Sequence, residues 1–143
     1  MSKKWDKRFL DLAEHISGWS KDPSTQVGCV IVNHNKTIIS VGYNGFPRGV
    51  EDHSGRYENR GIKYLLVQHA EANAIASAKE PLDGYTAYVT HHPCSNCTGL
   101  LIQSGIARIV TKEPDAEFAK RFQDSFDASK TMCREAGVEI DII

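Results

Sequence analysis

The sequence predicts an α/β fold with three layers, α-β-α, in which helices cover both faces of a five-stranded mixed sheet. Short β-rich runs alternate with segments at helical spacing along the whole 143-residue chain. A long helical segment, not a tight turn, joins the last two β-rich runs, so these strands should be parallel through a right-handed crossover. The length, with 41% hydrophobic and 24% charged residues, fits one globular domain over residues 1–143.

The first part of the chain should hold a helix, a hairpin and a loop. Apolar residues at helical spacing over residues 5–16 indicate an opening amphipathic helix. Residues 27–32 and 37–42 are β-rich, and the Asn-His-Asn-Lys between them is a hairpin signal. Residues 43–64 have the pattern of a polar, glycine-containing loop. Compact domains seldom keep so long a loop without a functional reason.

The second part should alternate helix and strand. A Pro-Leu-Asp-Gly turn follows its first helix, and Gly137 is expected to stop its last one. No repeat, low-complexity tract or interdomain linker interrupts the pattern. The expected elements are a helix over 69–79, a strand over 85–90, a helix to residue 104, a strand over 107–111, a helix over 116–136 and a strand over 138–142.

Two short motifs carry the chemistry: His69-Ala70-Glu71, and further along Pro93-Cys94-Ser95-Asn96-Cys97. One imidazole and two thiolates suit zinc, and three protein ligands leave a coordination position open, which is typical of catalytic zinc. H-x-E followed by P-C-x-x-C is the signature of zinc-dependent nucleobase deaminases. The predicted ligands of a catalytic Zn²⁺ are therefore His69, Cys94 and Cys97. Glu71 is the predicted proton carrier.

The spacing within each motif also predicts local geometry. Cys94 and Cys97, three residues apart, share one face of a helix. The preceding Pro93 fits a helix start, where free N–H groups and the macrodipole favour thiolates. His69 and Glu71 are two residues apart and would diverge on a regular helix. That helix should therefore begin near His69.

A lone C-x-x-C motif has other interpretations, as a redox pair or as half of a structural zinc site. The redox motif usually follows a strand in a βαβ unit, and a structural site needs a fourth ligand. Cys29, in an apolar strand, and Cys133, on the last helix, are more simply buried side chains. His92, directly before Pro93, should lie near the metal. Surface or supporting positions are expected for His15, His34, His53 and His91.

Composition narrows the class of protein further. A net charge of −1 with scattered lysines and arginines argues against a surface that tracks a polynucleotide. No apolar run has the length of a signal peptide or of a membrane span. Four cysteines, two of them assigned to a metal, agree with a reducing compartment. The expected location is cytoplasmic.

Nearly the whole chain resembles the deoxycytidylate (dCMP) deaminases, which have the cytidine deaminase-like fold. Beyond the zinc motifs, the resemblance rests on Asp-Pro-Ser-Thr-Gln-Val-Gly at 22–28, on Gly-Tyr-Asn-Gly-Phe-Pro-Arg-Gly at 42–49, and on Lys63-Tyr64 leading into residues 69–75. The zinc motifs identify only the superfamily. The Gly-Tyr-Asn-Gly-Phe-Pro block and the long loop after it resemble the nucleotide monophosphate branch. The small size is similar to bacterial and phage members, and a phage protein would act in the host cytoplasm.

This resemblance implies hydrolysis of dCMP to dUMP with release of ammonia, which supplies the precursor for dTMP synthesis. It also implies activation by dCTP and inhibition by dTTP, usually with Mg²⁺, in a homo-oligomer that is often a hexamer. Glu71 would take a proton from the attacking water, pass it to the pyrimidine N3 and then protonate the departing amine.

The resemblance also suggests residues for substrate and effector. Lys21 would hold the substrate phosphate, and Arg48 an effector phosphate. Simpler explanations exist, because Asn-Gly is a common tight-turn pair, Ser, Thr and Gln before a strand also serve as caps, and surface cations are usually solvated. The substrate set is Lys21, Ser24, Thr25, Gln26, Asn44 and Ala70. The effector set is Tyr43, Asn44, Gly45, Arg48, Glu58 and Tyr64.

Several functional classes remain open at this point. A tRNA- or DNA-editing deaminase shares the zinc chemistry but should show a basic surface with aromatic stacking groups around the pocket mouth. A cytidine or deoxycytidine nucleoside deaminase would lack phosphate selection. A zinc protein without catalysis would not need Glu71. The near-neutral charge and the 42–49 block favour the free-nucleotide enzyme.

Overall fold

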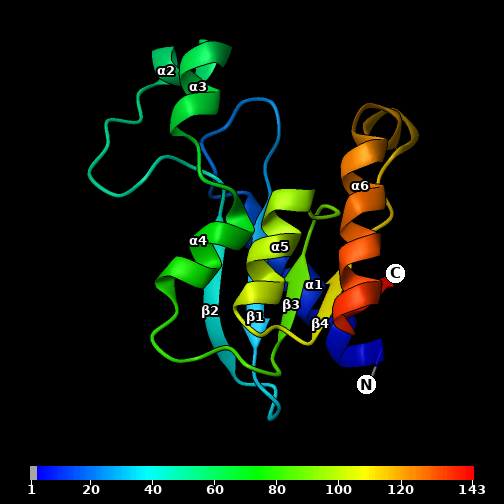
Figure 1. Ribbon diagram of the computed structural model, residues 1–143. Coiled ribbons are helices and arrows are strands. Elements are labelled where there is room, and N and C mark those ends of the chain that lie inside the picture. The colour runs from blue at the N-terminus through cyan, green and yellow to red at the C-terminus, as the bar shows by residue number, and fades with distance from the viewer. Residues whose placement is uncertain (1–2) are drawn as a thin grey trace.

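The computed structural model describes residues 3–143 and contains one five-stranded sheet with helices on both faces (Figure 1). No helix within these residues is both long and apolar enough to cross a membrane. The strands are β1 (Gly28–Val32), β2 (Ile38–Tyr43), β3 (Thr86–Val89), β4 (Arg108–Thr111) and β5 (Glu139–Ile142). The helices are α1 (Lys3–Ser17), α2 (Ser54–Glu58), α3 (Arg60–Leu66), α4 (Ala70–Ser77), α5 (Ser95–Gln103) and α6 (Ala116–Ala136).

The sheet has the strand order β2-β1-β3-β4-β5. β1 pairs antiparallel with both β2 and β3, whereas β3, β4 and β5 run parallel to one another. The parallel pairs are connected through α5 and α6, as a crossover requires. The predicted mixed sheet with parallel last strands is confirmed.

One face of the sheet is covered by α1, which lies behind the strands in Figure 1. Phe9, Ala13 and Ile16 recur at helical spacing and pack against Val30 and Tyr88 of the sheet. All five side chains are buried. The amphipathic pattern of the opening segment thus places its apolar stripe on the sheet.

The opposite face is covered by α4, α5 and α6, which lie in front of the strands in Figure 1. Ala74 of α4, Leu101 of α5 and Cys133 of α6 belong to one buried cluster with Cys29 and Ile109 of the sheet. Cys29 and Cys133 are therefore buried core side chains, as predicted. Neither joins the other two cysteines.

The segment 43–64 is not the continuous loop that the sequence predicted. It contains α2 and the first part of α3, which lie beyond the upper end of the sheet in Figure 1. Asn59 caps α3 by accepting a hydrogen bond from the backbone N–H of Ile62 at 3.1 Å. Tyr57 is buried and stacks on Phe46, with ring centroids 4.2 Å apart. Such short helices depend on packing and caps, which a periodicity pattern does not report.

The last helix has the bounds that the sequence predicted. Asp115 caps it by accepting from the backbone N–H of Phe118 at 2.8 Å, and Gly137 ends it with a positive φ of 75°. The backbone at Phe122 departs from helical angles, with φ −118° and ψ 20°, so α6 is kinked within its first half.

Candidate active site

The first motif lies where α4 begins, against strand β2. His69 precedes the helix with extended backbone angles, φ −74° and ψ 157°, and Glu71 is in the first turn. Because His69 is outside the regular helix, its ring and the Glu71 carboxyl are not forced to opposite sides. The prediction that the helix begins near His69 is confirmed.

The second motif lies where α5 begins. Cys94 is the N-cap, and its sulfur accepts a hydrogen bond from the backbone N–H of Cys97 at 3.4 Å. Ser129 of α6 fixes this end of the helix, because its hydroxyl donates to the carbonyl oxygen of Pro93 at 3.1 Å and accepts from Thr98 at 2.9 Å. Both sulfurs therefore stand at a helix N-terminus held by a neighbouring helix.

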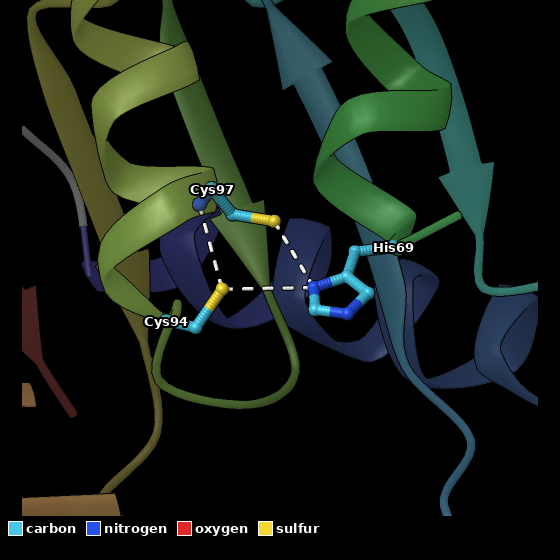
Figure 2. Close-up of side chains that lie close together, drawn as sticks. All are labelled: His69, Cys94 and Cys97. Carbon is cyan, nitrogen blue, oxygen red and sulfur yellow. Dashed lines mark hydrogen bonds between the residues drawn. The ribbon is translucent and has the colours of Figure 1, made fainter. Parts of the chain in front are cut away.

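Figure 2 shows the His69 ring facing the sulfur atoms of Cys94 and Cys97. The Nδ1 atom of His69 lies 3.2 Å from the Cys97 sulfur and 3.6 Å from the Cys94 sulfur. Tetrahedral zinc, with bonds of about 2.0 Å to nitrogen and 2.3 Å to sulfur, would place such atoms roughly 3.5 Å apart. The three atoms thus fit a zinc ion. Within residues 3–143, no other His, Cys, Asp or Glu belongs to this group.

The pKa values of the Cys94 and Cys97 thiols shift in opposite directions. Hydrogen bonds from the Cys97 side chain and then from His69 lower the pKa of Cys94 to about 4. The hydrogen bond with Cys94, together with burial, raises the pKa of Cys97, and a hydrogen bond with Cys94 raises that of His69. Two adjacent thiolates repel each other, so only one forms readily without a cation. A divalent ion would remove that penalty.

Glu71 is buried beside this cluster, with 4% of its surface exposed. Burial raises the pKa of its carboxyl to about 7, and the nearby charge of Cys94 adds to the effect. A carboxyl with a pKa near neutrality both accepts and donates protons at physiological pH, which is the property that general acid–base catalysis needs.

Both motifs open into a cavity of about 510 Å³, a size usual for small-molecule sites. Its wall is built from the segment before β1, the residue after β2, α3, the starts of α4 and α5, and α6. Four residues of the predicted substrate set line it, namely Ser24, Thr25, Asn44 and Ala70.

Two residues of that set lie outside the cavity wall. Lys21 forms an exposed ion pair with Asp52, with Nζ and Oδ2 2.9 Å apart. Gln26 donates from Nε2 to the carbonyl oxygen of Ser20 at 2.7 Å. Their assignment to substrate stays a prediction, but the structure brings neither side chain into the wall.

Asn44 lines the cavity and also holds the chain together. Its Nδ2 donates to the Thr25 carbonyl oxygen at 2.8 Å, and its Oδ1 accepts from the Val27 N–H at 2.8 Å. Most of its amide is therefore committed to protein. One lone pair on Oδ1 is left for a ligand.

Sequence reasoning missed an aromatic wall on α6. Phe118, Phe122 and Phe126 line the cavity, and Phe126 packs on the buried His92 ring at 4.5 Å between centroids. His91 also lines the cavity, instead of lying at the surface or behind it. The four-residue spacing of the phenylalanines was a usable signal, since it predicts a stripe on one helix face.

Three cations also line the cavity that were not predicted as site residues: Arg60 and Lys63 of α3, and Arg121 of α6. Arg60 and Lys63 share α3, whereas Arg121 comes from α6, so no single motif in the sequence joins the three. They add three positively charged side chains to a wall that also contains carboxyl and thiol groups.

A second cavity of about 380 Å³ lies between the end of β2, the segment after it and α4. The Arg48 guanidinium donates to the Ser77 hydroxyl at 3.2 Å beside it. The predicted effector residues divide as follows: Tyr43, Gly45 and Arg48 line this second cavity, Asn44 and Tyr64 line the first, and Glu58 lines neither. Their role stays a prediction.

Comparison with known proteins agrees with this geometry. Residues 3–113 match the family model of the cytidine and deoxycytidylate deaminase zinc-binding region. An uncharacterized deaminase in the luxG 3′ region of Aliivibrio fischeri is 49% identical, over 98% of this chain and 94% of the relative. Deoxycytidylate deaminase of Mus musculus is 35% identical, over 94% and 77%. The crystal structure of dCMP deaminase from cyanophage S-TIM5, in complex with dCMP and dUMP, has a TM-score of 0.78 and 26% identity, covering 100% and 99%. With its paired zinc motifs in one cavity, the chain belongs to the cytidine and deoxycytidylate deaminase family of zinc-binding hydrolases.

Proposed function

We propose that this protein hydrolyses dCMP to dUMP and ammonia, as one deaminase domain over residues 1–143. The observation that carries the proposal is a single cavity whose wall contains His69 and Cys94 of the His-Cys-Cys group and the Glu71 carboxyl, together with polar and basic side chains. The relative in Mus musculus is named a deoxycytidylate deaminase, and the S-TIM5 enzyme binds dCMP and dUMP. Both names support the nucleotide as substrate.

His69, Cys94 and Cys97 would hold Zn²⁺, which when bound supplies a Lewis acid that makes the attacking water more acidic. Glu71 would accept a proton from that water, deliver it to the pyrimidine N3 and then protonate the amine that leaves C4. Its pKa of about 7 supports both directions of transfer. Water replaces the amine, so the balance is dCMP plus water giving dUMP plus ammonia.

The remaining contacts follow from the wall of the cavity. Ala70 is the first residue of α4, and its backbone N–H has no partner within the helix, so it would bind the base. Ser24, Thr25 and Asn44 are polar residues of the cavity wall and would bind the sugar. The phosphate would be bound by cations in the wall, of which Arg60 and Arg121 are candidates in place of Lys21.

The substrate is tested by comparing dCMP, deoxycytidine, cytidine and a short single-stranded oligonucleotide in one absorbance assay with the zinc-loaded protein. We expect dCMP to be preferred over deoxycytidine by up to about a thousand-fold in kcat/KM, because two or three charged hydrogen bonds add together. Equal efficiency would identify a nucleoside deaminase. Turnover of the oligonucleotide alone would identify an editing enzyme, and no turnover would identify a zinc protein without catalysis.

The second cavity supports a further part of the proposal, regulation by dCTP and dTTP with Mg²⁺ in a cytoplasmic homohexamer. Tyr43, Gly45 and Arg48 lie there against α4, the helix that carries Glu71. A nucleotide bound in this cavity would therefore contact the helix that carries Glu71 and could shift its position. The dCMP saturation curve should be sigmoidal, with apparent affinity raised by dCTP and lowered by dTTP. The product dUMP would serve as the precursor of dTMP.

Arg48→Glu is the variant that tests the regulatory site. It should weaken the response to both triphosphates more than it alters turnover at saturating dCMP. Light scattering of the wild type checks the oligomer. Hyperbolic kinetics that neither triphosphate changes would remove the regulatory proposal and leave the deaminase one standing.

A further inference from the structure

The wall of the main cavity contains a buried ion pair between Asp22 and Lys63. The Nζ of Lys63 lies 3.3 Å from Oδ1 of Asp22, and the two side chains are only 6% and 5% exposed. Both residues line the cavity. Moving charges out of water costs free energy unless they are paired and hydrogen-bonded. The hydrogen bonds that these two side chains make therefore indicate which parts of the cavity wall they hold in place.

Asp22 organises the polar side of the cavity. Its Oδ1 also accepts from the backbone N–H groups of Ser24 at 2.8 Å and Thr25 at 3.2 Å, which closes a tight turn. Its Oδ2 lies 3.5 Å from Nδ2 of Asn44. One carboxylate thus holds three residues that line the cavity.

Lys63 belongs to α3, a helix that lies beyond the end of the sheet (Figure 1). Lys63 is buried, whereas the apolar side chains of Ile62 and Leu65 on the same helix are exposed. Arg60 and Tyr64 on the same helix line the cavity. The ion pair therefore ties the α3 wall of the cavity to the turn at Asp22.

A second Lys–Asp pair, which begins at Lys21 next to Asp22, serves as a comparison because it is exposed. Lys21 and Asp52 are 2.9 Å apart, but their side chains are 64% and 46% exposed. Exposed pairs contribute little to stability, because water solvates both charges. Burial of the neighbouring pair in the cavity wall calls for a different explanation.

We propose that Asp22 and Lys63 are positioning residues for the nucleotide, holding the Ser24–Thr25 turn, Asn44 and α3 at the spacing that the bound substrate requires. The inference rests on the proposed dCMP substrate. The pair should affect substrate binding more than catalysis, because it lies on the turn before β1 and on α3, whereas the zinc ligands and Glu71 lie at the starts of α4 and α5. Its loss should therefore change KM more than kcat.

The test compares Lys63→Met, Lys63→Arg, Asp22→Asn and the double variant Asp22→Asn/Lys63→Met with the wild type. Lys63→Met and Asp22→Asn should each raise KM for dCMP at least about tenfold, change kcat less than about threefold and keep wild-type zinc content. Calorimetry should show dUMP affinity weakened by the same factor. The double variant should be no worse than the poorer single one, because the pair acts as a unit.

Two controls separate positioning from stability alone. Lys63→Arg keeps the charge and should restore KM to within about threefold of the wild type. Lys7→Met breaks an exposed ion pair with Asp11 on α1 and should leave KM and dUMP affinity unchanged. If Lys63→Met does not fold, Asp22→Asn and Lys63→Arg still give the KM and dUMP readouts.

The inference would be overturned if the wild type turns over dCMP but Lys63→Met and Asp22→Asn leave KM and dUMP affinity unchanged. A double variant whose defects are the product of the two single ones would also overturn it. A wild type inactive on dCMP would instead count against the proposed function, and it is recognised before any variant is measured.

Discussion

Gly42 in β2 lies directly against Ala70 in α4: a Cβ atom at Gly42 would overlap the carbonyl oxygen of Ala70. The backbone N atom of Ala74, one turn later, is equally close to that position. Because Ala70 stands between His69 and Glu71, the edge strand sets the position of the helix turn that carries both groups.

Gly42→Ala should therefore displace α4. We expect a loss of about 1–3 kcal/mol in the free energy of unfolding, as for overpacking, and a lower kcat from a misplaced Glu71. Urea unfolding and steady-state assays measure the two effects. Gly99→Ala in α5 is the control, because a Cβ there meets no atom within 4 Å and should stabilise the helix by up to about 1 kcal/mol. Wild-type activity of Gly42→Ala would contradict this view of the strand.

Glu71→Gln should bind zinc normally but lose turnover. Removal of a general acid–base group costs about 10²- to 10⁴-fold, and here one carboxyl serves several proton transfers. Elemental analysis and kcat at saturating dCMP are the measurements. Glu135→Gln, an exposed glutamate at the end of α6, is the matched control. A Glu71→Gln enzyme with near-normal kcat would refute the proposed proton carrier.

Cys97→Ala should abolish zinc binding, since it removes one of three protein ligands. Metal that binds only the folded state stabilises it, so a chelator should lower the Tm of the wild type and leave that of Cys97→Ala unchanged. Cys133→Ala, a buried cysteine outside the group, should lower stability but keep the metal. An unchanged zinc content in Cys97→Ala would show that the cluster is not the metal site.

Stability should fall in acid because of Asp6. Hydrogen bonds from Arg108, at 2.9 and 2.8 Å, are the main cause that lowers the pKa of Asp6 in the folded state. The contribution of the ionised carboxyl is therefore fully present above the unfolded pKa of about 3.9, and it is lost as pH falls through the lower folded value.

Asp6→Asn tests this contribution directly. The variant should lower the free energy of unfolding at pH 7 by about 3 kcal/mol, the lower end for a broken buried pair, because Arg108 keeps Asp141 as a second partner. It should also flatten the acid limb of the curve of stability against pH. Urea unfolding between pH 7 and pH 2 measures both effects. Asp11→Asn breaks an exposed pair with Lys7 and should cost less than about 1 kcal/mol. Equal costs for the two variants would contradict a special role of the buried pair.

Phosphate selection should depend on cations of the cavity wall. Arg121→Glu should raise KM for dCMP by about 10- to 100-fold and leave deoxycytidine unaffected, because each charged hydrogen bond contributes about 1.5–3 kcal/mol. Lys21→Glu tests the residue that the resemblance suggested, and it should have the smaller effect because Lys21 is outside the wall. Lys120→Glu, the exposed neighbour on α6, is the control. The opposite ranking of Arg121 and Lys21 would restore the assignment made from the sequence.

The sequence predicted elements that depend on local pattern. The helix over 116–136 was placed to the residue, because Gly137 adopts a positive φ that favours glycine. The strands and the starts of α4 and α5 followed from β-rich runs and from ligand spacing. By contrast, α2 and α3 were missed, since their stability comes from the Phe46–Tyr57 stack and the Asn59 cap.

By itself, the sequence determined α1, α4, α5, α6, the five strands, the parallel end of the sheet and the His-Cys-Cys-Glu chemistry, because each depends on a pattern within one short segment. Only the tertiary structure decided which cations and aromatic side chains join that chemistry. Lys63, Arg121 and Phe122 reach the cavity from helices distant in sequence. Their positions depend on how α3 and α6 pack around the sheet, and no local pattern encodes that packing.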